Sequence, residues 1–144
     1  MRYKQDEDAV IESAQSSIAD GITLGSRGLL ADAIEAFEKA LSTCHSVKRK
    51  SAALHFFTAQ ALGNKGATLG DLDRYADAVE CYDAAIAIYI RMAERGAHVD
   101  VPSSYAVSGY SRKCSALQTH LRPATRWSLI RWQRLQPRRN KLIQ

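Results

Sequence analysis

The side chains of this sequence that are best suited to bind a metal are two cysteines and two histidines. Cys44 and His45 are adjacent, whereas His55 and Cys81 stand alone. Zinc sites are usually built from pairs of ligands that are separated by about two to five residues. Adjacent residues of a helix point about 100° apart, so Cys44 and His45 do not make such a pair. The spacing predicts no metal site, and Cys81 is expected to be a small buried core residue.

The sequence contains no motif for catalysis or for a cofactor. Its serine, histidine and acidic residues do not occur in a G-x-S-x-G turn, and there is no Walker-type or Rossmann-type glycine loop. Gly63, Gly66 and Gly70 lie close together, but in a segment that is predicted to be helical rather than between a strand and a helix. We therefore expect a protein that is not an enzyme and needs no cofactor.

The C-terminal segment 122–144 is strongly basic. Residues 101–144 carry 9 Lys and Arg and no acid, whereas residues 1–100 carry 11 Lys and Arg and 15 Asp and Glu. Arginines that alternate with tryptophans are suited to phosphate contacts and base stacking. The residues of the segment that are candidates for such contacts are Arg126, Trp127, Arg131, Trp132 and Arg134.

Other interpretations of this basic segment stay open. Its composition also suits an anionic membrane surface, an intramolecular contact with the acidic part of the chain, or a solvated terminus. We expect a helix from about residue 124 to residue 135, followed by a disordered end. The loss of every acidic residue after Asp100 is compatible with a divergent cap and also with a truncated or out-of-frame end.

Two segments of the chain, 21–41 and 66–86, repeat each other without a gap. At an offset of 45 positions nine residue pairs are identical. A fixed period of this size indicates stacked supersecondary units. Apolar residues recur at helical spacing, and they predict two helices in each unit, at about 7–25, 29–46, 51–70 and 73–95. Gly25 and Gly28 are expected at the first turn, Gly70 and Asp71 at the second, and Gly96 at the end of the last helix.

The order of small and aromatic residues in the second helix of each unit resembles the tetratricopeptide repeat. The residues that carry the resemblance are Ala33, Phe37 and Ala40 in one unit and Ala78, Tyr82 and Ala85 in the other. Gly21 and Gly66 stand where that family places a Gly or Ala in the first helix. The period of 45 residues exceeds the usual length of about 34, and it is similar to long-period arrays of bacterial proteins.

The resemblance implies an all-α fold, a right-handed α-solenoid of antiparallel helix pairs with about five or six helices. A repeat domain is expected over residues 1–121, with units at about 7–50, 51–98 and, in part, 103–121, followed by the basic helix or tail over 122–144. The third unit rests on residues 105–117, which are similar to residues 57–69.

The resemblance also implies a non-catalytic protein–protein interaction module, an adaptor or scaffold whose concave groove, formed by the first helix of each unit, binds a peptide or protein segment. The candidate groove residues are Gln15, Ile22, Gln60, Asn64, Lys65, Arg112 and Lys113. The alternative is a module that associates with nucleic acid or an anionic surface through its basic tail.

Three units are close to the minimum for a stable stack, so a homodimer or a larger assembly is expected. No apolar run approaches the roughly 20 residues of a membrane span. The three cysteines are an odd number at wide spacing, which argues for a reducing compartment. Because the N-terminal residues are also polar and acidic, the sequence favours a cytoplasmic protein.

Overall fold

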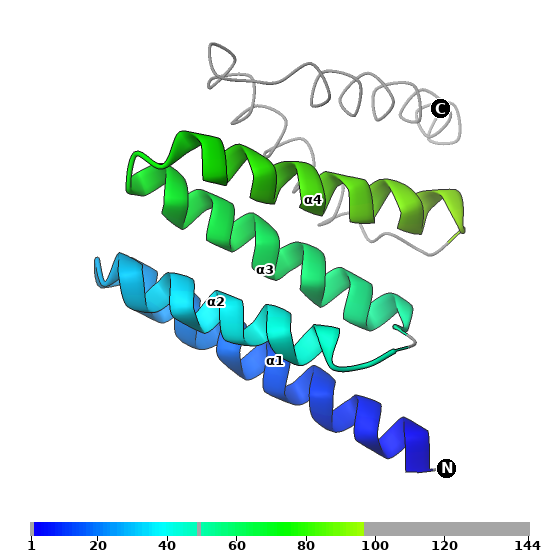
Figure 1. Ribbon diagram of the computed structural model, residues 1–144. Coiled ribbons are helices and arrows are strands. Elements are labelled where there is room, and N and C mark those ends of the chain that lie inside the picture. Colours follow the sequence, from blue (N-terminus) through cyan, green and yellow to red (C-terminus); the bar gives the residue numbers. More distant parts are fainter. Residues whose placement is uncertain (1, 49, 97–144) are drawn as a thin grey trace, which may run out of the picture.

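The computed structural model describes the backbone of residues 2–48 and 50–96, and the side chains of this part from Asp6 onward. These residues form four α-helices and no strand (Figure 1). The helices are α1 (Arg2–Ser26), α2 (Leu30–His45), α3 (Ala52–Asp71) and α4 (Tyr75–Glu94). The expected third unit at 103–121 and the basic segment 122–144 lie outside the described residues.

The predicted helix ends agree with the structure except at the start of the chain. The helix predicted from about residue 7 begins at Arg2. No Gly or Pro occurs before Gly21, and the polar residues that precede Val10 are mostly compatible with a helix. The apolar periodicity marks only the part of α1 that packs against other helices, so it misses the polar first turn.

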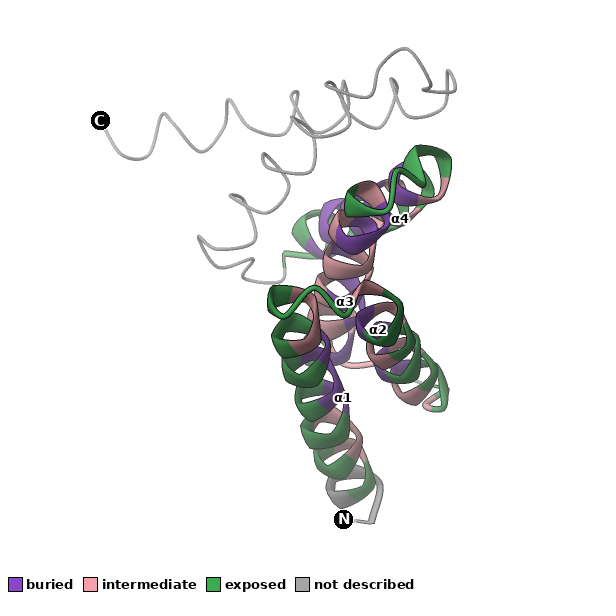
Figure 2. Ribbon diagram, turned by 90° about the vertical axis from the view of Figure 1, so that its left-hand side faces the viewer, coloured by how far each residue is buried: buried purple, intermediate pink, exposed green. Residues whose placement is uncertain are grey.

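The four helices form two antiparallel hairpins, which stack on each other (Figure 1). In each unit the first helix, α1 or α3, is called the A helix, and the second, α2 or α4, is called the B helix. Helix α3 packs against α4 of its own unit, against α2 of the preceding unit and also against α1. Figure 2 shows α1 on one side of the stack and the two B helices on the other.

Small residues let the two helices of each unit approach closely. Ala33, Ala40, Ala78 and Ala85 are completely buried on the B helices. The aromatic residue between each pair of alanines points at a glycine of the A helix. A Cβ atom added at Gly21 would lie 2.5 Å from Phe37, and one added at Gly66 would lie 3.1 Å from Tyr82.

Both hairpin turns have the same hydrogen-bond pattern. The N–H of Leu29 donates to the carbonyl of Leu24 (3.0 Å), and that of Arg74 donates to Leu69 (2.9 Å). This is the Schellman pattern, which requires a left-handed residue just before the last donor. Gly28 (φ +77°) supplies it in the first turn and Asp73 (φ +59°) in the second.

The expected second turn at Gly70 and Asp71 lies slightly too early in the sequence, because α3 continues through both residues and ends at Asp71. The left-handed residue is Asp73, and it stands where helices usually carry a glycine. Gly96 does have the expected positive φ (+67°) after the end of α4.

Contacts between the units are apolar in the centre and charged at the edge. Ile34 of α2 packs against Leu69 and Tyr82 of the second unit, and Ile18 of α1 shares a cluster with Ala61 of α3. At the edge, the ammonium of Lys65 lies 2.9 Å from a carboxylate oxygen of Glu38. Helix α3 therefore provides the main contact of the second unit with the first.

Candidate functional site

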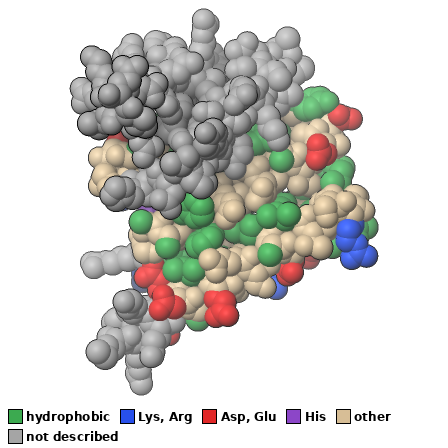
Figure 3. Space-filling view, turned by 180° about the vertical axis from the view of Figure 1, so that it is seen from behind, with side chains coloured by type: hydrophobic (Ala, Val, Ile, Leu, Met, Phe, Trp, Pro, Cys, Tyr) green, Lys and Arg blue, Asp and Glu red, His purple; other side chains and the backbone are tan. Residues whose placement is uncertain are grey.

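Five of the predicted groove residues lie on the A helices, and Lys65 of α3 differs from the other four in its contacts. Gln15 is exposed on α1, Ile22 is 50% exposed on the same helix, and Gln60 and Asn64 are partly exposed on α3. Helices α1 and α3 contact each other. Gln15 and Ile22 are seven residues apart and Gln60 and Asn64 are four apart, so each pair lies on one side of its own helix. Figure 3 views the molecule from the side on which α1 lies and shows apolar side chains gathered along the surface, with acidic side chains beside them. We call this surface the A-helix face.

The other three predicted groove residues are placed differently. Lys65 forms its ion pair with Glu38 of α2, and it points about 100° away from its neighbour Asn64 around the helix axis. The structure therefore does not bring the Lys65 ammonium together with Gln60 and Asn64. Arg112 and Lys113 lie outside the described residues, as do all candidate residues of the basic tail.

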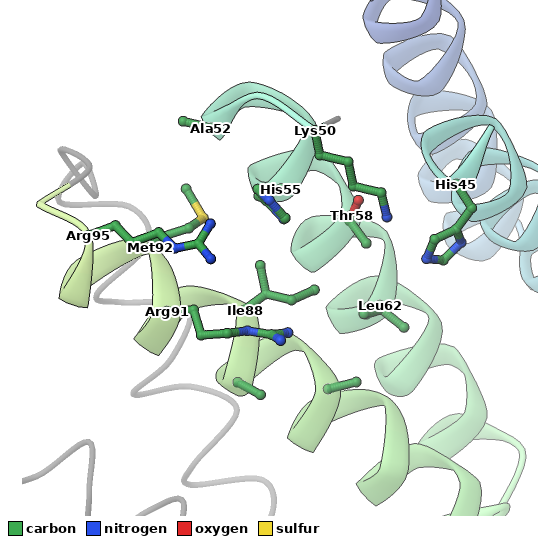
Figure 4. A pocket seen from close by; sticks show the side chains of 12 residues that line it. His45, Lys50, Ala52, His55, Thr58, Leu62, Ile88, Arg91, Met92 and Arg95 are labelled. Atoms are coloured by element: carbon green, nitrogen blue, oxygen red, sulfur yellow. The ribbon is translucent and has the colours of Figure 1, made fainter. Parts of the chain in front are cut away.

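A cavity of about 650 Å³ lies on the other side of α3, between the two B helices. Its basic side chains come from α2, from Lys50 just before α3, from α3 itself, and from the end of α4 with the residue that follows it (Figure 4). They are His45, Lys50, His55, Arg91 and Arg95. Its apolar lining includes Leu62, Ile88 and Met92. We call this site the basic cavity.

The basic cavity has one sign of charge. No Asp or Glu is among its lining residues, and no ion pair involves Lys50, Arg91 or Arg95 within the described part of the chain. The pKa of His55 is lowered from its ordinary value, first by burial and then by the charges of Lys50, Arg95 and Arg91. The positive charges are therefore close enough to repel a further proton.

The sequence pattern did not reveal this cavity. In the sequence His45 and His55 stand out only as possible metal ligands, and no motif marks Arg91 or Arg95. The two arginines are four residues apart, a spacing that puts both on one side of α4. That signal was present in the sequence, but the approach of His45 and Lys50 depends on how the hairpins stack.

A second hollow, of about 920 Å³, is lined by α1 and α2 and has the opposite charge. Asp20, Asp32, Glu35 and Glu38 line it, with Lys39 as its single Lys or Arg. The two hollows thus separate acidic and basic side chains onto different parts of the described surface.

No group of three or more His, Cys, Asp or Glu side chains is arranged to hold a metal ion within residues 2–48 and 50–96. Cys44 is buried in a cluster with Ala14 and Leu54. Cys81 is partly buried rather than fully buried, and it packs beside Ala78 and Tyr82. Burial raises the pKa of the Cys81 thiol, with the nearby Lys65 opposing this shift. The thiol is therefore not activated as a nucleophile.

Two stacked hairpins with small residues at each contact define a helical repeat protein. Residues 58–96 match the family model described as tetratricopeptide repeat, so this unit of the chain is a tetratricopeptide repeat. A search of curated proteins and a search of solved structures each found no match. None of the described helices is long and apolar enough to cross a membrane. A repeat of this family indicates a protein–protein interaction module, a class that generally lacks catalytic activity.

Proposed function

We propose that this chain is a non-catalytic adaptor or scaffold of the cytoplasm, and that it binds a peptide or protein segment along the A-helix face. One observation carries the proposal: the A helices of two stacked units contact each other, and they carry a half-exposed Ile22 on α1 and exposed or partly exposed amide side chains on both helices. An isolated exposed isoleucine is ordinary. Its place on the face that the repeat family uses for binding gives it significance.

The chemistry of the A-helix face suits an extended segment. The amides of Gln15, Gln60 and Asn64 both donate and accept hydrogen bonds, as the backbone of a peptide does. Ile22 offers an apolar contact for one side chain of the partner. The helices are held by packing within and between the units, so little conformational entropy is lost when the segment binds. In this proposal Lys65 stabilises the contact between units through Glu38.

The proposal extends the array by a partial third unit at 103–121, which would continue the A-helix face with Arg112 and Lys113. The sequence of α4 supports this third unit, because its residues correspond to those of α2 at the offset of 45 positions. Val79 corresponds to Ile34, which contacts the following unit, and Asp83 corresponds to Glu38. Homodimerisation or docking onto a larger assembly belongs to the same proposal, because a short array covers few of its apolar surfaces.

A pull-down from nuclease-treated lysate tests the binding surface. The baits are the full chain, the double variant Ile22→Asp/Asn64→Ala, and the control Leu72→Asp. Leu72 is exposed to a similar degree as Ile22, 40% against 50%, but it lies at the turn between α3 and α4. Circular dichroism establishes that each variant is folded. A protein partner that is lost with the double variant and kept with the control supports the proposal.

Retention of all partners by the double variant would contradict the A-helix face as the binding site. A bait that ends at residue 121 tests the alternative, in which the tail binds nucleic acid or an anionic surface. Loss of binding with this bait, or after nuclease treatment, would assign the function to residues 122–144.

A further inference from the structure

We propose that the basic cavity is a second binding site, and that it takes an acidic peptide segment that carries an apolar side chain. The cavity lies on the opposite side of α3 from Gln60 and Asn64, so this site is separate from the A-helix face. Success or failure at one of the two surfaces does not decide the other.

Charge is the first argument. Acidic residues outnumber Lys and Arg in residues 1–100, 15 to 11, yet the lining of this cavity, within residues 2–48 and 50–96, includes three Lys and Arg, two His and no acid. These basic side chains come from α2, from the residues before α3, from α3 and from the end of α4. No amphipathic pattern on a single helix therefore accounts for them. Unpaired like charges that are brought together destabilise a fold. A bound anion removes that cost.

The shape and the apolar lining narrow the class of anion. A volume of about 650 Å³ falls within the roughly 300–1,000 Å³ of ligand sites in proteins. Leu62, Ile88 and Met92 offer a surface for an apolar side chain. Arg91 and Arg95 suit carboxylates, because a guanidinium donates two parallel hydrogen bonds to a carboxylate. Carboxylates next to an apolar side chain are a common feature of acidic peptides.

Other occupants fit less well. Residues 101–144 of this chain contain no acid, so the basic tail would be repelled. A single-stranded nucleic acid is usually held by aromatic side chains on which its bases stack, and the described residues that line the cavity include no Phe, Tyr or Trp. A lipid surface is flat on this scale and would not reach the apolar lining of a concave site. An acidic protein segment also agrees with the interaction module that the repeat family indicates.

The pH dependence follows from the groups that face His55. These are Lys50 from the residues before α3, Arg91 of α4 and Arg95 just after it, and His45 from α2 across the cavity. The pKa of His55 in the free protein is kept low first by burial and then by the charges of Lys50, Arg95 and Arg91. A bound carboxylate offsets them and raises that pKa, so binding takes up a proton. Affinity is therefore expected to increase as the pH falls from about 7.5 to about 6.

The probe is a fluorescein-labelled synthetic peptide in which Glu alternates with Leu, titrated with the full chain and followed by fluorescence anisotropy. A matched peptide has Gln in place of each Glu. The variants are Arg91→Gln, Arg95→Gln and the control Arg27→Gln, which removes one arginine from an exposed turn residue outside the cavity. We expect roughly tenfold weaker binding for each cavity variant, unchanged binding for the control, and no binding of the Gln peptide.

Proton NMR of the His55 ring supplies the second measurement, with a His55→Gln variant to assign its signal. The His55 pKa is expected to rise when the Glu–Leu peptide is added. An unchanged pKa, or binding that the cavity variants do not weaken, would overturn the proposal.

Three further outcomes would overturn the acidic peptide as occupant. Equal binding of inorganic phosphate would reduce the site to a simple anion site. Stronger binding of an oligothymidylate would indicate nucleic acid. A doubled mass in sedimentation without peptide, reversed by Arg91→Gln, would indicate that the acidic hollow of a second copy occupies the cavity.

Discussion

The two repeat units have the same order of helices and the same hydrogen-bond pattern at their turns, but they differ in how tightly the A and B helices pack. In the first unit a methyl group at Gly21 would lie 2.5 Å from the Phe37 ring. In the second unit the corresponding contact, from Gly66 to Tyr82, is 3.1 Å. The first turn has a glycine in the left-handed conformation, whereas the second has Asp73. The same pattern of residue types therefore sets the fold of both units, and individual side chains set how much stability each one contributes.

The largest effect is expected where the two units agree. Ala78 and Ala85 are completely buried at the contact between α3 and α4. An arginine at either position forces a charge and a long side chain into this contact, and it should reduce the free energy of unfolding by about 4 kcal/mol or more. Thermal denaturation followed by circular dichroism measures the change for Ala78→Arg and Ala85→Arg.

Ala76→Arg is the matched control, because Ala76 is exposed on the same helix and its stability should change by less than about 0.5 kcal/mol. If Ala78→Arg or Ala85→Arg retained the stability of the wild type, the proposed alignment of the repeat would be wrong. The corresponding changes at Ala33 and Ala40 should be about as severe, since these residues are also completely buried.

The glycine pair tests the difference between the units. Alanine favours a helix over glycine by about 1 kcal/mol, and the overlap with the aromatic ring opposes this gain. At Gly21 the overlap with the buried Phe37 should dominate, so that Gly21→Ala loses about 1–3 kcal/mol. At Gly66 the Tyr82 ring (3.1 Å) and the backbone carbonyl of Ala78 (3.2 Å) each need to give by a few tenths of an ångström. This is a smaller overlap than at Gly21, so Gly66→Ala should lose less.

A second substitution separates overlap from other causes. Phe37→Leu shortens the side chain that faces Gly21, so the cost of Gly21→Ala should be smaller in that background. Urea denaturation of the four proteins in this cycle gives the coupling. Additive effects, or a Gly66→Ala that costs more than Gly21→Ala, would contradict the comparison of the two contacts.

Substitutions at the two turns should change the stability by a smaller amount, and with opposite sign in the two units. Gly28→Ala places a Cβ atom on a residue with φ +77° and should destabilise the protein by about 1 kcal/mol. Asp73→Gly removes the strain at φ +59° and should stabilise it by up to about 1 kcal/mol. The change in the melting temperature measures both, and equal signs would show that the two turns are not equivalent.

Asp73→Gly has an independent readout at Tyr75. The hydroxyl of Tyr75 donates a hydrogen bond to the Asp73 carboxylate, and this bond, followed by the charge of Asp73, raises the pKa of Tyr75. Without the carboxylate the pKa should return toward its ordinary value near 10. A spectrophotometric titration of tyrosine compares the variant with the wild type.

How far the sequence predicts this molecule depends on the range of the interactions involved. The helices and the packing of Phe37 and Tyr82 follow from the 45-residue period and from residue size. The left-handed Asp73 was missed because its conformation depends on hydrogen bonds of the turn, which glycine-based rules do not cover. The basic cavity was missed because His45, Lys50 and Arg91 are brought together by the stacking of hairpins. Short-range patterns thus predict the units, whereas sites between units depend on tertiary packing.

The smallest effect is expected at the ion pair between the units. Glu38 is 57% exposed and Lys65 21% exposed at their side chains, so solvent screens much of their attraction, and the pair should contribute about 0.5 kcal/mol. A double-mutant cycle with Glu38→Gln and Lys65→Met in low salt measures the coupling, and about 1 M sodium chloride should abolish it. The pair Arg74–Asp77 within the second unit serves as the control for screening alone. A coupling of several kcal/mol would mean that charge, rather than the apolar contact of Ile34 with Leu69 and Tyr82, holds the two units together.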